Sequence, residues 1–261
     1  MMKEFISGVW HSVKAFGFMF KQGLWQYYLY PALVSLLFYF FLIGALIKYA
    51  YVLVQLILKP YVPDKLPELN GFWDFMNVFS NISIYSISAI IVSLLTLFLA
   101  SRFSKYIVLI ILAPIFSVLS EKIDSKLTGL KYDFSFAQFI QDMIRGISIA
   151  IRNLMIELFW TALFTIASIF SGGLALIGTP VLLIISAYFY GFSMMDYTCE
   201  RRKLSISEGV KYVRRFRWFA IGNGVVYILT DMIPVVGGII APVNGICGAT
   251  TGLLELEKKS I

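Results

Sequence analysis

Long apolar runs without a single charge alternate with short polar segments along this chain. The runs cover residues 31–47, 82–101, 158–195 and 232–254. A helix rises about 1.5 Å per residue, so about 20 apolar residues cross a hydrocarbon core about 30 Å thick. Four such runs exceed what one small globular core can bury. The pattern therefore predicts an all-α integral membrane protein.

Two of the runs predict long membrane-spanning helices. Span 1 begins at Pro31, which suits the first turn of a helix, and continues over 31–58. Span 2 covers 82–120 and is predicted to kink near Pro114, because proline removes a backbone hydrogen bond within a helix. Residues 59–81 between the two spans contain three prolines and predict an extramembrane loop.

Three segments place apolar and polar residues on opposite helical faces, as surface helices do. They cover 3–21, 132–157 and 205–217. In the last of them, Ser205 and Glu208 have the spacing of a capping box, which predicts the start of a helix. The first segment is predicted to lie in the membrane interface. Its apolar face holds Phe5, Val9, Trp10, Val13, Phe16 and Phe20.

Glycine and proline interrupt the two apolar regions 158–195 and 218–254. The halves on either side hold about 14 helical residues and reach about 21 Å, which is less than the hydrocarbon core. We therefore expect two re-entrant helical hairpins that enter the membrane partway and bend near Gly173 and Gly237. Six complete spans are the alternative, and both arrangements leave the two termini in the cytoplasm.

Basic residues gather in one segment of a chain that is otherwise 59% hydrophobic and has a net charge of +7. Seven Lys and Arg fall between residues 196 and 217, which places this segment in the cytoplasm by the positive-inside rule. The basic side chains either anchor the chain in anionic lipid, at about 1 kcal/mol each, or form an electropositive vestibule for anions. The vestibule residues are Arg201, Arg202, Arg214 and Arg215.

The sequence contains no motif that predicts an enzyme. The sequence contains no recognisable nucleophile and base pair, no metal-spaced cluster of His and Cys, and no Walker-type phosphate loop. With one histidine and two cysteines in the chain, no cofactor or metal is expected. A basic block beside lipid indicates headgroups or an anionic solute as partners rather than nucleic acid.

Several short motifs occur along the chain in a specific order. They are Tyr30-Pro31, Ala113-Pro114-Ile115-Phe116, the segment 117–121, Asp196-Tyr197, Arg214-Arg215, Ile233-Pro234, Ala241-Pro242-Val243 and Gly248-Ala249-Thr250. In order and spacing the chain resembles the CysZ family, the sulfate permeases of bacterial cysteine biosynthesis, which share a domain with the eukaryotic etoposide-induced membrane proteins. The resemblance extends over nearly the whole chain.

The resemblance implies two long spanning helices, two partly penetrating hairpins and a homo-oligomer, such as a hexamer, in the bacterial inner membrane. It also implies ATP-independent uptake of sulfate, with the anion held partly by the family's Gly-Leu-Leu-Ala-Glu segment. Serine hydroxyls replace the glycine and the alanine of that segment here and add donors for an oxyanion. In this chain the segment is Ser117, Val118, Leu119, Ser120 and Glu121.

One departure from the family concerns the positive charge that an anion needs. Sulfate-binding members carry two arginines shortly before the proline that opens the first span, whereas this chain has Trp25 and Gln26 there. A buried dianion requires matching positive charge, because removing an ion from water is costly. We expect Lys21, Arg102 and Lys105 to supply that charge.

The leading hypothesis is a membrane permease for sulfate or a similar small oxyanion, feeding sulfur assimilation. Its expected partners are membrane lipid, the oxyanion and further copies of the chain. The alternative is a non-transporting membrane scaffold that shapes lipid or docks partner proteins, which the absent arginine pair favours.

Overall fold

The computed structural model describes residues 1–37, 40, 41, 44, 48, 52, 110–132, 135–171, 174–233 and 236–258. The chain divides into two compact units, Met1–Ser35 with Tyr106–Ile261, and Leu36–Lys105. Most of predicted span 1, the beginning of predicted span 2 and the loop between them lie outside the described residues. The helices with defined bounds all belong to the first unit.

Every element with defined bounds is helical, so the all-helical class predicted from the sequence is confirmed. In chain order the elements are α1 (Met2–Lys21), the 3-10 helix η1 (Trp25–Tyr28), a helical segment over 29–37, a second over 110–128, α4 (Phe136–Ser171), α5 (Leu174–Arg201), α6 (Ile206–Arg215), α7 (Arg217–Asp231) and α8 (Gly237–Lys258). Among the described residues, three stretches are long and apolar enough to cross a membrane. They are Phe136–Ala167, Gly178–Arg201 and Gly237–Lys258.

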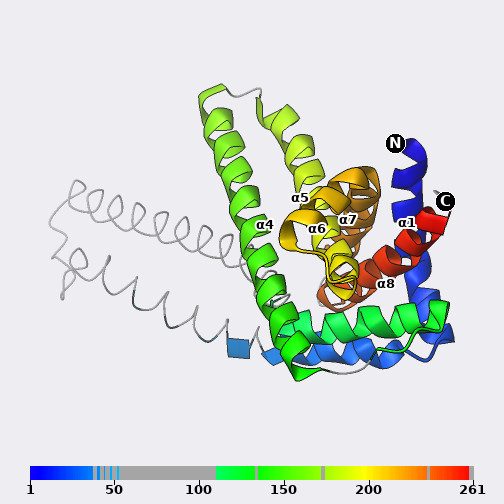
Figure 1. Ribbon diagram of the computed structural model, residues 1–261. Coiled ribbons are helices and arrows are strands. Elements are labelled where there is room, and N and C mark those ends of the chain that lie inside the picture. Colours follow the sequence, from blue (N-terminus) through cyan, green and yellow to red (C-terminus); the bar gives the residue numbers. More distant parts are fainter. Residues whose placement is uncertain are drawn as a thin grey trace, which may run out of the picture. The chain divides into compact units, whose positions relative to one another are not determined.

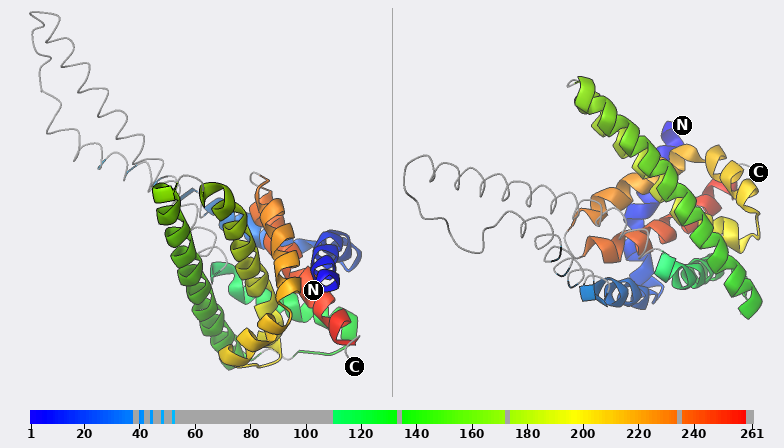
Figure 2. Two further views of the ribbon diagram at one scale, coloured as in Figure 1. Left: turned by 90° about the horizontal axis from the view of Figure 1, so that it is seen from above. Right: turned by 90° about the vertical axis from the view of Figure 1, so that its left-hand side faces the viewer.

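The helices of the first unit pack around α5 and α7. α4 and α5 lie side by side and antiparallel (Figure 1). α5 also packs against α7, which in turn contacts α1 and α8 (Figure 2). Fully buried apolar side chains from these helices fill the centre. They include Met19 of α1, Phe192 and Met194 of α5, Phe219 of α7, and Ile246 and Leu253 of α8.

Small residues bring the backbones of α5 and α7 into direct contact. A Cβ atom added to Gly224 would lie 1.7 Å from the carbonyl oxygen of Ala187, and one added to Gly191 would lie 1.9 Å from that of Ala220. Each helix therefore presents an alanine and a glycine four residues apart, which is the small-xxx-small pattern of close helix pairs in membranes. Van der Waals contact along this crossing holds the two helices in one register.

α1 covers the range where the sequence predicts an amphipathic helix, but its apolar side chains face outward. The residues buried against α7 and α8 are Gly8, Ser12, Ala15 and Met19. Four residues of the predicted apolar face, Trp10, Val13, Phe16 and Phe20, are exposed instead, with Trp10 at 55%, whereas Phe5 and Val9 are partly buried. Small residues allow close helix packing, whereas large apolar residues are stable against lipid. The interfacial position of α1 stays a prediction.

α4 continues through the boundary near residue 158 that the sequence analysis places between a surface helix and a hairpin. Two of its polar residues pair with serines of α5. The Ser186 hydroxyl donates to Glu157 Oε1 at 2.6 Å, and the Asn153 amide donates to Ser193 Oγ at 3.2 Å. The apolar halves of about 14 residues predicted here therefore belong to longer helices, since α4 has 36 residues and α5 has 28.

α7 and α8 form a second pair of consecutive helices, of unequal length. α7 has 15 residues and reaches about 22 Å, less than a hydrocarbon core of about 30 Å. α8 has 22 residues and reaches about 33 Å. Gly237, where a bend is predicted, is the first residue of α8, whereas Gly173 lies outside the described residues. Length alone thus allows α8, but not α7, to cross a bilayer.

The basic helix α6 begins as its sequence predicts. The Ser205 hydroxyl accepts a hydrogen bond from the Glu208 backbone N–H, and the Glu208 carboxylate accepts one from the Ser205 backbone N–H at 2.8 Å. These two bonds form the predicted capping box, which satisfies backbone donors at the helix start. The hydrogen bonds from Ser205 lower the pKa of the exposed Glu208 carboxyl. The helix ends at Arg215.

Candidate functional site

The segment 117–121, which the resemblance assigns to anion binding, lies within the helical segment 110–128. Its five side chains differ in how deeply they are buried. Leu119 and Ser120 are fully buried, whereas Ser117, Val118 and Glu121 are half-buried. Because this is a helix, Ser120 shares a face with the residue four positions later, Asp124. This face is directed at the end of α5.

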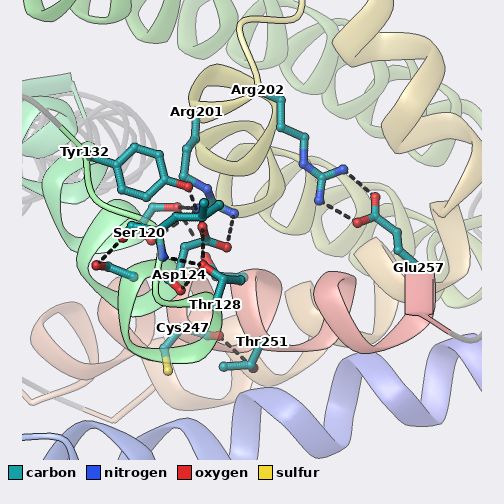
Figure 3. Close-up of polar contacts among 12 residues, drawn as sticks. Ser120, Asp124, Thr128, Tyr132, Arg201, Arg202, Cys247, Thr251 and Glu257 are labelled. Atoms are coloured by element: carbon teal, nitrogen blue, oxygen red, sulfur yellow. Dashed lines mark hydrogen bonds and ion pairs between the residues drawn. The ribbon is translucent and has the colours of Figure 1, made fainter.

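Arg201, the last residue of α5, reaches this face with a side chain that is only 4% exposed. Its Nη1 donates to the carbonyl oxygen of Ser120 at 3.2 Å and to Ser120 Oγ at 2.5 Å. Its Nη2 lies 3.2 Å from Asp124 Oδ1, and the Asp124 side chain is also 4% exposed. Figure 3 shows Arg201 directed at Ser120 and Asp124. The predicted anion segment therefore already holds a buried guanidinium.

The Asp124 carboxylate is shared between Arg201 and the hydroxyl of Tyr132. The Tyr132 hydroxyl donates to Asp124 Oδ2 (Figure 3). The Thr128 hydroxyl donates to the backbone carbonyl of Asp124 at 2.9 Å, and its oxygen lies 3.4 Å from Oδ2. Burial, followed by the hydrogen bond to Asp124, raises the pKa of Tyr132 to about 12. Tyr132 consequently stays protonated near neutral pH and acts as a donor. The two oxygens of Asp124 thus contact different donors.

Two further contacts connect the segment to α5 and α8. The Ser117 hydroxyl donates to the Glu200 carboxylate, which is buried at the end of α5. The hydroxyls of Ser120 and Thr250 lie 3.2 Å apart, and both residues are fully buried. Hydroxyl groups can donate or accept, so each can reorient toward another acceptor. The serines that depart from the family motif are therefore both engaged in polar contacts.

Arg202 forms a separate cluster next to this one. Its guanidinium makes two hydrogen bonds with the Glu257 carboxylate, and the Nη2–Oε2 distance is 2.6 Å (Figure 3). The Tyr212 hydroxyl donates to Glu257 Oε1 at 2.7 Å. Both charged side chains are between a quarter and a third exposed. This cluster joins α5, α6 and α8 and lies closer to solvent than Arg201.

The structure does not bring all predicted site residues together. Arg214 and Arg215 are exposed at the end of α6, so the predicted vestibule divides into two paired arginines and two exposed ones. Lys21 is exposed at the end of α1. Trp25 and Gln26, which replace the family's arginines, are exposed in η1. Arg102 and Lys105 lie outside the described residues.

The groups around Arg201 are hydrogen-bond donors of the kind that oxyanions accept. A guanidinium with several hydroxyl groups offers the directed donors that sulfate or a related oxyanion requires. No group of three or more His, Cys, Asp or Glu side chains suited to a metal ion occurs among the described residues. In this structure the negatively charged partner of Arg201 is the carboxylate of Asp124.

Several residues of the cluster were missed by the sequence analysis. Ser120, Asp124 and Thr128 recur at four-residue spacing and so share one helical face, and this spacing is a signal present in the sequence. Glu200 and Thr250 give no comparable signal, because they meet the segment only through tertiary packing.

The amino-acid sequence of this chain is similar to a known protein family and to several named proteins. The family model described as "Sulfate transporter CysZ/Etoposide-induced protein 2.4" matches residues 12–242. A protein named "Sulfate transporter CysZ" from Pseudomonas paraeruginosa is 26% identical over 247 residues, which cover 94% of this chain and 93% of that protein. Its namesake from Pseudomonas aeruginosa matches to the same extent. The protein of that name from Pseudomonas fluorescens is 27% identical over 149 residues, covering 54% of this chain and 57% of that protein. Because the family model spans most of its length, this chain belongs to the sulfate transporter CysZ/etoposide-induced protein 2.4 family.

Proposed function

We propose that this protein is a membrane permease for sulfate or a similar small inorganic oxyanion, and that it works without ATP and is not an enzyme. Membership of the family and relatives named as sulfate transporters support the substrate class. The single observation that carries the proposal is the buried guanidinium of Arg201 on the segment 117–121. It supplies the positive charge that the absent arginine pair at Trp25 and Gln26 does not.

The local chemistry suits a weakly held anion. Moving sulfate out of water is costly, and a fixed guanidinium together with hydroxyl donors offsets part of that cost. Ser117 and Ser120 lie one turn apart. The Ser117 hydroxyl can donate to an anion if Glu200 is displaced, and the Ser120 hydroxyl, which accepts from Arg201, can donate its hydrogen to an anion in place of Thr250. A carrier must release its cargo as well as bind it, so a site with a competing carboxylate at Asp124 fits transport better than tight storage.

Equilibrium binding tests this assignment. Purified protein in detergent is expected to bind radiolabelled sulfate saturably, with sulfite, molybdate, phosphate and chloride as competitors. Arg201→Lys keeps the charge but loses the planar pair of donors, so it is expected to weaken binding at least tenfold, which is about 1.4 kcal/mol. Arg215→Lys makes the same chemical change at an exposed position and is the matched control.

Absence of saturable sulfate binding, or equal binding by both lysine variants, would contradict the assignment. Co-purification of a stable protein partner together with absent anion binding would favour the alternative, a non-transporting membrane scaffold.

We further propose the membrane arrangement that the resemblance implies. Span 1 and span 2 cross the bilayer, α4 with α5 and α7 with α8 form two re-entrant hairpins, and both termini are cytoplasmic. The chain assembles as a homo-oligomer in the bacterial inner membrane. The short α7 supports partial entry of the second hairpin. The backbone at such bends needs cover from neighbouring protein, which favours assembly.

Accessibility labelling distinguishes hairpins from six complete spans. Ser171 ends α4 and Met232 follows α7, and both residues are exposed. Ser171→Cys and Met232→Cys are expected to resist a membrane-impermeant thiol reagent added outside intact cells, because both bends lie within the membrane. The native Cys199 and Cys247 are buried and provide a low background. Strong labelling of both variants from outside would instead indicate six complete spans.

A further inference from the structure

We propose that Asp124 is an internal counter-ion that occupies the anion position on Arg201, and that an incoming oxyanion binds by displacing this carboxylate. Asp124 thereby sets how tightly the protein binds its substrate. This inference rests on the proposed permease function and names a residue that controls the affinity of its site.

The ion pair of Asp124 and Arg201 differs from a second buried Arg–Asp pair in the same unit. Arg145 donates two hydrogen bonds to the Asp196 carboxylate, from Nη2 to Oδ1 at 2.8 Å and from Nε to Oδ2 at 3.3 Å. Its Nη1 donates to the Leu204 carbonyl. Arg201 meets Asp124 at one contact of 3.2 Å, from Nη2 to Oδ1. The pair of Arg145 and Asp196 is bidentate, whereas the pair of Arg201 and Asp124 has a single contact and is more easily opened.

Opening the pair does not release the guanidinium from the site. Nη1 of Arg201 donates to both the carbonyl oxygen and the hydroxyl of Ser120. These two hydrogen bonds do not involve Asp124, so they persist when the carboxylate leaves. The Nη2 group then points from a fixed guanidinium toward the space that the carboxylate vacates. An oxyanion entering there meets a donor that is already oriented, which lowers the entropy cost of binding.

Opening the pair also does not leave the Asp124 carboxylate without a hydrogen-bond partner. Asp124 Oδ2 accepts a hydrogen bond from Tyr132 and lies 3.4 Å from the Thr128 hydroxyl, while Oδ1 faces Arg201. The Thr128 hydroxyl donates to the backbone carbonyl of Asp124 at 2.9 Å, so Tyr132 is the donor that remains with the carboxylate when Nη2 is taken by an oxyanion. A buried carboxylate without any partner is strongly destabilising, so this retained donor makes the exchange energetically accessible.

The charge of Asp124 opposes substrate binding in two ways. It competes for Arg201, and it repels a dianion that approaches the same guanidinium. Asp124→Asn removes the negative charge and preserves the shape and the acceptor for Tyr132. Loss of one like charge near the site is expected to tighten sulfate binding by about tenfold.

Sulfate binding to the full chain in detergent tests the proposal, with Asp196→Asn as the matched control. Asp196→Asn neutralises the other buried Arg–Asp pair and is expected to leave the sulfate affinity unchanged while lowering thermal stability. If wild type binds sulfate but Asp124→Asn binds equally or more weakly, the proposal is overturned. If wild type binds no sulfate, the permease function fails. In that case, binding that arises only in Asp124→Asn still supports the counter-ion role, and binding by neither protein overturns it.

Tyr132→Phe gives a test with the opposite sign, which does not depend on the folding of Asp124→Asn. It removes the donor that remains with Asp124 after the pair opens, so displacing the carboxylate from the guanidinium becomes more costly. Sulfate binding is expected to weaken by about fivefold, the equivalent of one hydrogen bond. Unchanged or tighter binding by folded Tyr132→Phe would contradict the proposal.

Discussion

Gly224→Ala is expected to destabilise the packed unit by about 3 kcal/mol, the upper end of the range for an overpacked contact. The added Cβ would lie 1.7 Å from the carbonyl oxygen of Ala187. α5 and α7 would have to move apart by roughly 1.5 Å to restore ordinary contact distances. Backbone atoms cannot yield as a flexible side chain does, and the neighbouring contact between Gly191 and Ala220 would be lost at the same time. Thermal unfolding in detergent, followed by size-exclusion chromatography, measures the effect.

Gly17→Ala is the control for this experiment. Gly17 lies in α1, and a Cβ added there meets nothing within 4 Å. Alanine favours a helix more than glycine does, so this variant is expected to be as stable as wild type or slightly more stable. Equal midpoints for Gly224→Ala and Gly17→Ala would mean that the contact between α5 and α7 does not determine stability.

Arg201→Met is expected to cost about 3–5 kcal/mol of stability and to abolish sulfate binding. The substitution leaves Asp124 as a buried carboxylate without its guanidinium. Tyr132 satisfies part of its hydrogen-bonding capacity but none of its charge. The midpoint of thermal unfolding and the binding of labelled sulfate measure the two effects.

The double variant Arg201→Met with Asp124→Asn separates stability from binding. Removing both charges eliminates the unpaired carboxylate, so most of the lost stability is expected to return. Sulfate binding is not expected to return, because the guanidinium is still absent. A double variant that is stable and still binds sulfate would exclude Arg201 as the anion-binding cation.

Local signals predicted the parts of this fold that depend on local chemistry. The apolar runs predict helices, and the capping box at Ser205 and Glu208 forms where its spacing predicts. The boundary predicted near residue 158 does not coincide with a helix end, because α4 continues through it to Ser171. Glu157 and Asn153 are paired with serines of α5, which no local pattern reveals.

The candidate site was only partly predictable for the same reason. The family resemblance indicated the segment 117–121, and the basic block indicated Arg201, but as members of two different sites. Their contact joins residues 81 positions apart and depends on how α5 packs against the helical segment 110–128. Asp124 could not be recognised from the sequence, because an acidic residue in a short polar stretch is usually exposed to solvent. Its burial becomes evident only with its partners in the fold.

Uptake of radiolabelled sulfate into proteoliposomes tests the central claim most directly. The wild-type protein is expected to carry sulfate down its gradient without ATP, well above protein-free liposomes. The stable double variant lacking the charges of Arg201 and Asp124 is expected to match protein-free liposomes. Sulfate flux through wild type no greater than the protein-free background, or equal flux through wild type and the double variant, would contradict a permease that binds its anion at Arg201.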